Sequence, residues 1–216
     1  MININKLTKQ ELKDRLKFKC KHRHNGLTHP ECYIDEDMRV CYLDIESTAL
    51  TATFGMVLST AIKERDNPNI MVSKFKFGLT NGFDRPCIQS TVDILKQFDV
   101  VVTYYGGDYR FDIPMIRTKA DEYNISFPEY GDMVSIDLYT VVKKKYKLHS
   151  NRLDVACRIN GIQGKTHLDP KIWKAAMFGD PGALEYVVEH NKQDVVILEK
   201  LHKRLEKYMP VKKSSI

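Results

Sequence analysis

The sequence predicts an α/β fold in which helices flank a mixed β-sheet, and three observations lead to this prediction. Three apolar stretches rich in strand-forming residues follow one another with short polar breaks, as in an antiparallel meander: 39–46, 55–64 and 69–77. Helix, strand and helix patterns then alternate over 88–123. The chain from Ile136 onward is nearly all helical in pattern. A βββαβα order followed by helices is typical of a mixed sheet covered by helices.

The first 37 residues predict a short helix and a Cys/His-rich loop. Thr8 and Glu11 have the spacing of a capping box, and Leu16 follows Leu12 at a helical interval. We therefore divide the chain into an N-terminal helix with a candidate zinc knuckle (1–37), one main α/β domain (38–210) and a polar tail (211–216).

Composition sets the class of protein. The 216 residues are 43% hydrophobic, enough for one well-formed core, and the formal charge of +6 suits a polyanionic partner without selecting one. Five cysteines at scattered positions form no disulfide framework, and the opening "MININKLTKQ" has no apolar signal region. No apolar run approaches the roughly 20 residues of a membrane span. These features predict a reduced, cytoplasmic protein without a membrane partner.

Two carboxylates interrupt the first apolar stretch, "VCYLDIESTA". Asp44 and Glu46 are two residues apart, so on a strand they face the same side. Unpaired and buried, they would repel each other and lose hydration at a cost of several kcal/mol, which a divalent cation or a basic partner must offset. The alternative is an edge strand that leaves both acids in solvent or salt-bridged.

Further acids stand at the starts of, or inside, predicted helices. Asp112 follows a strand, a glycine-bearing turn and Phe111, where a simple helix cap is the alternative. His190 and Asp194 are four apart, on one face of a helix with apolar stripes. For this pair the alternative is a surface contact.

Together, "LDIE", "RFDIP" and "EHNKQDV" resemble the motifs of the DEDD exonucleases of the ribonuclease H-like fold, in particular those of bacterial and phage nucleases akin to the proofreading domain of family B DNA polymerases. The resemblance covers about residues 38 to 208. It implies that the main domain is a 3′→5′ exonuclease, in which two Mg²⁺ or Mn²⁺ ions hydrolyse a phosphodiester. Its implied ligands are Asp44, Glu46, Asp112 and Asp194. Hard carboxylate oxygens are the ligands that these ions prefer.

His190 takes the place of the group that positions or deprotonates the attacking water. Relatives have a Tyr four residues before the last Asp or a His five before it, whereas this chain combines the first spacing with the second residue. An imidazole, with an ordinary pKa of about 6.5, is a suitable base near neutrality.

Substrate contacts are expected around these motifs. The turn "YYGGDYRFD" lacks the Asn usual in the related motif; its Gly106 and Gly107 would either permit close approach of a nucleic-acid backbone or simply form a tight turn. A basic cluster, 143–147, with Tyr146 within it, would hold phosphates and stack a base, or form a solvated helix face. The remaining predicted substrate-binding residues are Ser47, Thr48, Phe111, Arg152 and Lys165.

The segment "CKHRHNGLTHPEC" predicts one structural Zn²⁺ site. Four of five candidate ligands would complete a tetrahedral set: Cys20, His22, His24, His29 and Cys32. The alternatives are a basic nucleic-acid-binding loop or unconnected polar surface. Cys41, Cys87, Cys157 and Trp173 stand in apolar contexts and are predicted to be core residues.

The sequence therefore predicts a metal-dependent nuclease acting on nucleic acid, with DNA favoured over RNA and the oligomeric state left open. One alternative is a non-catalytic or weakly catalytic nucleic-acid-binding subunit of a replication or phage assembly. Another is an RNA-directed or endonucleolytic enzyme. Retention of all four acids argues against the first, because a subunit that only binds has no need of them.

Overall fold

The computed structural model describes residues 7–19, 23–29, 38–76, 84–107, 109–129, 131–164 and 168–209. Its centre is a five-stranded sheet in the order β3-β2-β1-β4-β5. β1 pairs antiparallel with β2, and β2 with β3, whereas β1, β4 and β5 run parallel. The strands are β1 (Val40–Ser47), β2 (Val57–Glu64), β3 (Ile70–Lys74), β4 (Val100–Thr103) and β5 (Val134–Asp137).

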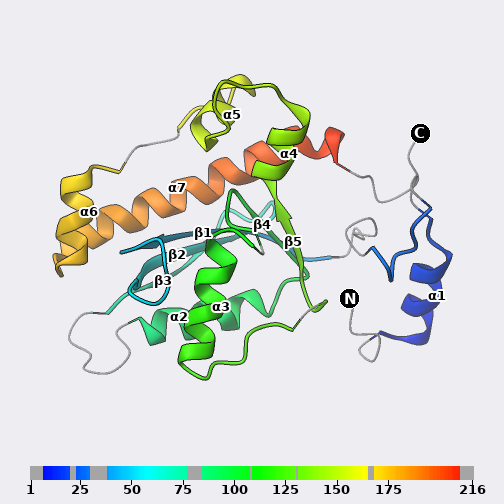
Figure 1. Cartoon of the computed structure of the whole chain (residues 1–216), viewed down its shortest axis with the longest axis horizontal. Coiled ribbons are helices and arrows are strands. Elements are labelled where there is room, and N and C mark those ends of the chain that lie inside the picture. The colour runs from blue at the N-terminus through cyan, green and yellow to red at the C-terminus, as the bar shows by residue number, and fades with distance from the viewer. Residues whose placement is uncertain are drawn as a thin grey trace.

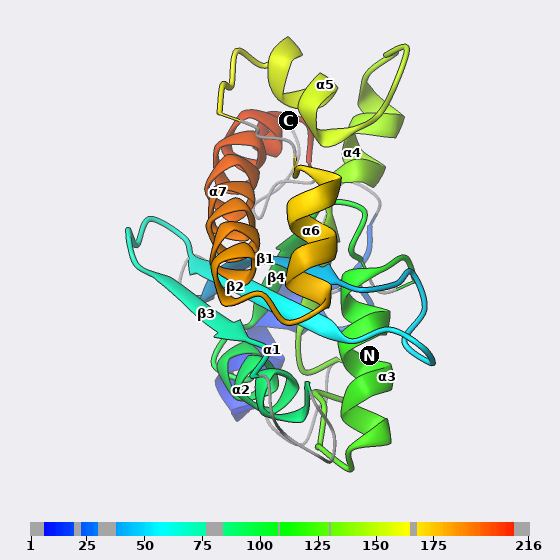
Figure 2. The ribbon, with the colours of Figure 1, turned by 90° about the vertical axis from the view of Figure 1, so that its left-hand side faces the viewer.

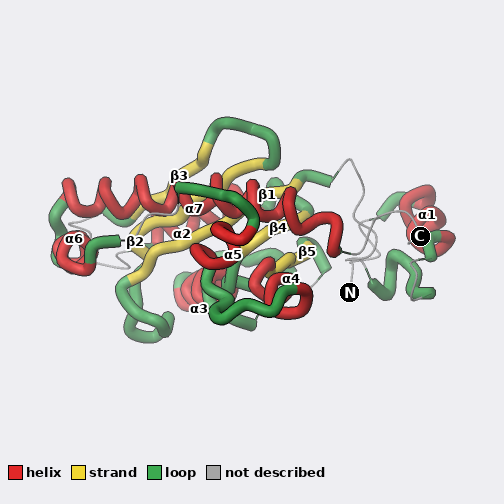
Figure 3. Tube along the Cα trace, turned by 90° about the horizontal axis from the view of Figure 1, so that it is seen from above, coloured by secondary structure: helices red, strands yellow, loops and turns green. Residues whose placement is uncertain are grey.

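Helices cover both faces of this sheet. α2 and α3 lie on one face and the long α7 crosses the other, with α4 and α5 beside its C-terminal half (Figure 1). α6 runs alongside the first part of α7 (Figure 2), and from above α7 lies over the sheet while α1 lies beyond one end (Figure 3). The helices are α1 (Lys9–Lys17), α2 (Arg85–Leu95), α3 (Asp112–Glu122), α4 (Leu138–Lys145), α5 (Leu153–Ile159), α6 (Pro170–Met177), α7 (Pro181–Leu205) and the 3₁₀ turn η3 (Glu206–Tyr208).

The central strand β1 divides the core into two layers. Cys41, Leu43 and Ile45 belong to the apolar cluster on the α2 and α3 side. Tyr42, on the alternate face, packs in the cluster that includes Leu198 of α7. Because successive side chains of a strand point to opposite faces, Asp44 and Glu46 share the face of Tyr42 and point toward α7.

The predicted mixed α/β sheet and the βββαβα order are confirmed. The capping box of α1 is also present, since Thr8 Oγ1 accepts from Glu11 N at 3.2 Å and Glu11 Oε2 accepts from Thr8 N at 2.7 Å. β5 was not predicted: this strand has only four residues, none fully buried, and so lacks an apolar run.

The side chains assigned to the core behave in two ways. Cys41, Cys87 and Cys157 are buried free thiols, as predicted. Trp173, predicted to be a core residue, packs against a small core cluster between α6 and α7 but is only half-buried, so part of it is exposed. No helix in the described part of the chain is long and apolar enough to cross a membrane.

A buried histidine anchors α7 to the sheet. His202 Nδ1 lies 3.0 Å from the hydroxyl of Tyr42, and both side chains are buried. Burial lowers the pKa of His202 to about 4, a shift that nearby Arg65 supports and the Glu206 carboxylate opposes. The imidazole is therefore neutral in the folded protein near pH 7 and must stay so to remain buried.

We expect this histidine to make the fold sensitive to mild acid. An unfolded histidine takes up a proton near pH 6.5 but folded His202 does so only near 4. The free energy of unfolding should thus fall from pH 6.5 toward 4, by at most about 1.4 kcal/mol per pH unit from this group. Urea unfolding at a series of pH values measures the slope.

The variant His202→Gln should be less stable at pH 7 and show a shallower slope in the acid range. His149→Gln, which changes an exposed histidine, is the matched control and should leave the slope unaltered. An unchanged slope in His202→Gln would contradict the assignment.

Candidate active site

The parallel pairing of β1, β4 and β5 brings their carboxyl ends to one edge of the sheet. Asp44 and Glu46 lie near the end of β1, Gly106 follows β4, and Asp137 ends β5. Loops that leave the carboxyl ends of parallel strands form the usual ligand crevice of such sheets. This edge is therefore where the predicted acids gather.

Asp112 is a buried member of this group of acids. It is the first residue of α3, whose N-cap is Phe111, so the predicted alternative of a simple cap does not describe it. Its Oδ2 is buried and has no hydrogen-bond partner among the described residues. Burial, followed by the negative charges of Asp44, Glu46 and Asp137, raises its pKa well above the ordinary value. Such a carboxylate is stabilised by a cation or by a proton.

Two glycines leave room for carboxylates of the protein itself. A Cβ on Gly106 would lie 1.9 Å from Asp112 Oδ2, and one on Gly107 would lie 2.8 Å from Asp137 Cβ. The carbonyl of Gly106 also accepts from Ile113 N at 3.0 Å, which closes the turn into α3. These contacts favour the tight-turn interpretation of both glycines.

Helix α7 supplies a buried polar turn that faces the acids of β1. His190 Nε2 lies 3.9 Å from Glu46 Oε1 and 3.6 Å from Asp194 Oδ2, so it stands between carboxylates of two elements. His190 and Asp194 are both buried. They are therefore not the surface pair that the sequence left open as an alternative.

Asn191 holds the helix and two strands together at this point, and the sequence did not single it out. Its Nδ2 donates to Asp44 Oδ2 at 2.6 Å, and its Oδ1 accepts from Ser59 Oγ at 2.9 Å. A signal was present: Asn191 occupies the apolar stripe, four residues before Val195. A polar residue at such a position needs a buried partner, and here Asp44 is one of its two partners.

Asp137 is the second functional residue that the sequence did not reveal. Its Oδ1 accepts from the backbone N–H groups of Tyr105 and Tyr139, at 2.9 and 3.0 Å. Its Oδ2 forms an ion pair with Arg110 Nε at 2.7 Å. From sequence, "IDLYT" signals only a helix cap, because the loop that Asp137 also holds is more than 25 residues away in the chain.

Three predicted substrate residues line one pocket beside the acids. Ser47, Thr48 and Phe111 border a cavity of about 480 Å³ together with Glu46 and Trp173, which we call the Glu46 pocket. The exposed part of the Trp173 ring thus belongs to this pocket. Its walls are predominantly apolar, and Glu46 is the one predicted metal ligand among the residues that line it.

The other predicted contacts lie elsewhere. Arg152 is exposed at the N-cap of α5 and borders a separate pocket. Tyr146 is half-buried, packing on Tyr208 and donating to Asn160 Oδ1 at 2.9 Å, so it is not a free surface for a base. Lys165 lies outside the described residues.

The zinc prediction also falls largely outside the described residues, which omit Cys20, His22 and Cys32. His24 and His29 are described, and their rings stack with centroids 3.6 Å apart and planes at 16°. A metal is bound through the lone pair in the plane of each ring, and stacked rings do not direct these lone pairs to one point. The zinc site stays a prediction.

The acid cluster has the right kind of ligand atoms for a divalent cation, but its side chains do not converge on one point. In the described ranges, no three His, Cys, Asp or Glu side chains converge closely enough to hold a metal ion as they stand. The donor set nevertheless fits Mg²⁺ or Mn²⁺, because it consists of carboxylates and one of them, Asp112, has a buried oxygen without a hydrogen bond. A bound cation would have to draw these side chains together by rotation.

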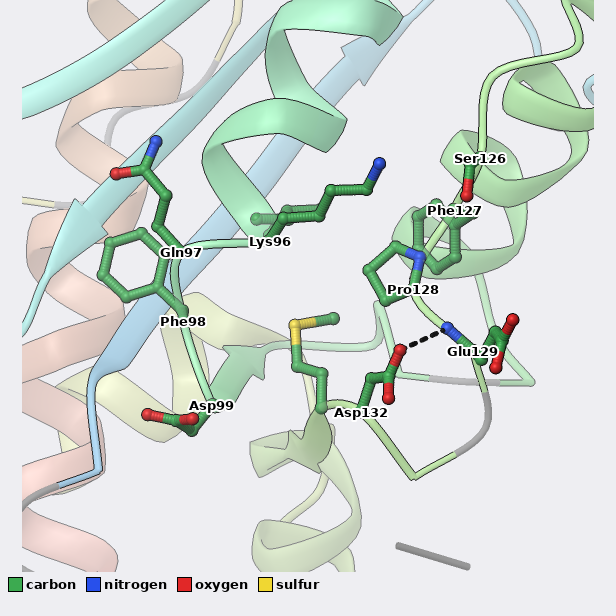
Figure 4. Close-up of a pocket in the computed structure, with 11 residues that line it drawn as sticks. Lys96, Gln97, Phe98, Asp99, Ser126, Phe127, Pro128, Glu129 and Asp132 are labelled. Atoms are coloured by element: carbon green, nitrogen blue, oxygen red, sulfur yellow. Dashed lines mark hydrogen bonds between the residues drawn. The ribbon is translucent and has the colours of Figure 1, made fainter. Parts of the chain in front are cut away.

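A cavity of about 440 Å³ lies at the opposite edge, between the segments that precede β4 and β5 (Figure 4). Two of its acids accept hydrogen bonds from backbone N–H groups: Asp99 Oδ2 from Arg39 N at 2.9 Å and Asp132 Oδ2 from Glu129 N at 3.1 Å. The cavity therefore has no evident relation to the acid cluster.

We expect Gly106→Ala to destabilise the protein, because the new methyl group would occupy the space of the Asp112 carboxylate. Overpacking of this kind costs roughly 1–3 kcal/mol. Gly182→Ala is the matched control, since its Cβ would meet only Asp180 Oδ1 at 3.4 Å. Chemical denaturation compares the two, and equal stability of both variants would show that the contact is not restrictive.

Asp112→Asn should stabilise the metal-free protein near pH 7. The raised pKa of Asp112 means that its ionisation opposes folding as the pH rises above 3.8, so removal of the charge should add about 1 kcal/mol in EDTA. The same change should weaken stabilisation by Mn²⁺. Thermal unfolding with EDTA and with Mn²⁺ tests both effects.

Asp121→Asn, on the exposed side of the same helix, is the control and should stay within about 0.5 kcal/mol of the parent protein. A loss of stability in Asp112→Asn without metal would contradict the electrostatic interpretation.

Comparison with known proteins agrees with this architecture. Among curated proteins no match to the chain was found. The family B DNA polymerase of the hyperthermophilic archaeon Pyrobaculum calidifontis superposes with a TM-score of 0.65 at 20% identity, covering 81% of this chain and 25% of the polymerase. The chain thus corresponds to about a quarter of that protein. A family model described as the RNase_H superfamily matches residues 41–206, and the chain belongs to that superfamily.

Proposed function

We propose that the chain is a divalent-metal-dependent nuclease, acting as a 3′→5′ exonuclease on single-stranded DNA. The observation that carries this proposal is the placement of acids from three elements at the carboxyl edge of an RNase H superfamily sheet: Glu46 and Asp194 lie within 4.0 Å of His190, and Asp112 lies within electrostatic reach of Asp44 and Glu46. The likeness to a family B DNA polymerase and the resemblance of the motifs to polymerase proofreading domains favour DNA as the substrate.

Asp44, Glu46, Asp112 and Asp194 would hold two Mg²⁺ or Mn²⁺ ions. When bound, these ions would lower the pKa of a water molecule and neutralise charge on the phosphodiester. The protein's own part is to fix the carboxylates in advance. Asn191 holds Asp44 through its Nδ2, and the turn at Gly106 closes against Asp112.

His190 is suited to take the proton of the attacking water at Nε2. A neutral imidazole accepts a proton near neutral pH. Glu46 and Asp194 each present a carboxylate oxygen within 4.0 Å of Nε2. Once His190 is protonated, both negative charges stabilise the imidazolium.

The Glu46 pocket would receive the terminal nucleotide. Phe111 and Trp173 offer aromatic surface, and Glu46 connects the pocket to the acid cluster. A base that is paired and stacked within a duplex cannot enter an aromatic-lined pocket without leaving its neighbours. This supports attack on an unpaired end.

The proposal predicts that Asp44→Asn loses metal-stimulated nucleotide release. Loss of one charged ligand should lower the rate by roughly 100-fold or more, whereas Asp93→Asn, an exposed change on α2, should have the parent rate. The measurement uses DNA strands with a fluorophore at the 5′ end, Mn²⁺ and separation of products by length. Progressive shortening from the 3′ end is the expected pattern.

Other outcomes would correct the proposal in specific ways. Internal fragments alone would indicate an endonuclease, and faster cleavage of an RNA strand of the same sequence would indicate an RNA-directed enzyme. Tight binding without turnover at millimolar Mn²⁺ would indicate a nucleic-acid-binding subunit. Full activity of Asp44→Asn in a preparation free of contaminating nuclease would remove the metal-ligand assignment.

A further inference from the structure

A second aromatic pocket opens beside the loop that follows β4. It has a volume of about 370 Å³, and three tyrosines line it: Tyr104, Tyr105 and Tyr139. The loop 150–153 with the exposed Arg152 forms its other wall. Tyr104 ties the two walls together, because its hydroxyl donates to Asn151 O at 2.6 Å. We call this cavity the tyrosine pocket.

Tyr105 is held in an unfavourable backbone conformation to present its ring there. Its φ is 63°, a left-handed value that a bulky residue seldom adopts, and the residue is 51% exposed. The hydrogen bond from Tyr105 N to Asp137 fixes this conformation. Strain that is retained while an aromatic ring stays at the surface points to a role in binding.

Arg110 stabilises the rings of Tyr105 and Tyr139 by cation–π contacts. Its guanidinium carbon lies 4.9 Å from the ring centre of Tyr105 and 4.5 Å from that of Tyr139, within cation–π range. The two rings meet edge to face, with centroids 4.9 Å apart. Because Arg110 is also paired with Asp137, the aromatic surface is held firmly before any ligand arrives.

The pocket adjoins the proposed catalytic acids. Gly106, the residue after Tyr105, packs directly on the Asp112 carboxylate. Asp137 holds Tyr105 and also contributes to the raised pKa of Asp112. A strand whose phosphate lies at the acids therefore passes close to the tyrosines.

The charge around the pocket fits a polyanion. Lys143, Lys144, Lys145 and Lys147 are exposed at the end of α4, and Arg152 borders the pocket itself. Within the described residues, no ion pair neutralises any of these five side chains. Aromatic rings interleaved with free positive charge are characteristic of sites for single-stranded nucleic acid.

We propose that the tyrosine pocket is a subsite for one unpaired base of the substrate strand, separate from the Glu46 pocket. The base stacks on the exposed ring of Tyr105, beside the Tyr139 ring that meets it edge to face, and Arg152 with the lysines at and after the end of α4 contacts the adjoining phosphates. This proposal rests on the proposed nuclease function and specifies where the strand runs beyond the nucleotide that is cleaved.

An abasic-site walk tests the proposal. A 12-nucleotide DNA strand labelled at its 5′ end is made in versions that lack one base at successive positions, and binding is measured by anisotropy in EDTA, where no cleavage occurs. In the parent protein, removal of the base at one internal position should weaken binding by about 5- to 150-fold.

Two variants of Tyr105 separate stacking from structure. Tyr105→Gly relieves the positive φ, so thermal stability should be unchanged or higher, while binding of the intact strand weakens and the abasic effect at that position disappears. Tyr105→Phe keeps the ring and should behave as the parent protein.

The abasic effect surviving in Tyr105→Gly, or no internal position showing one, would overturn the subsite. Because cleavage in Mn²⁺ is measured separately on the same proteins, that result would leave the proposed nuclease standing. Conversely, a normal abasic pattern without cleavage would retain the subsite and reject the nuclease.

Discussion

The structure depends on burying carboxylates of like charge next to one another. Asp112 is enclosed while Asp44, Glu46 and Asp137 all act on it electrostatically. Such an arrangement opposes folding unless something else fixes the backbone, because each ionised group loses hydration and repels its neighbours. A site of this kind therefore lowers the stability of the metal-free protein, a loss that the proposed cations would offset.

Each of three acids is held by a contact from outside its own helix or strand. Asn191 of α7 donates to Asp44, the turn at Gly106 closes on Asp112, and Arg110 is paired with Asp137. These contacts do not neutralise the cluster as a whole, because Arg110 is the one basic side chain among them and it is paired with Asp137. Asp112 is thus oriented while its Oδ2 has no hydrogen bond within the described residues, which suits it to the cation site that we propose.

Helix α7 links this cluster to the stability of the whole fold. Leu184 and Val187 pack with α6, while Leu198 and Leu201 pack against the sheet. The polar turn with His190 lies between these apolar sections, so its position is set from both sides. The packed layers resist a shift of the helix, so they fix the backbone position from which His190 reaches Glu46.

Features of the site could be predicted from sequence where they depend on residues close together in the chain, and not where they depend on distant ones. The pair Asp44 and Glu46 was readable because strand alternation is local, and His190 with Asp194 because helix periodicity is local. Asn191 carried a local signal too, as a polar residue in an apolar stripe. The role of Asp137 did not, because its partners Tyr105 and Arg110 come from another loop, and β5 itself is too short to show a pattern.

The loop between β4 and α3 shows why one residue, Asp137, affects two sites. Through Tyr105 N it maintains the strained conformation that presents an aromatic ring, and through Gly107 it packs against the turn that seats Asp112. Its charge also acts on Asp112 directly. A change of Asp137 itself would therefore affect both the tyrosine pocket and the acid cluster, because this carboxylate contacts the loop of the first and acts on Asp112 in the second. If the tyrosine pocket and the acid cluster bind one strand, the distance between the stacked base and the cleaved phosphate depends on Asp137. This carboxylate holds the loop of the pocket in place next to the acids.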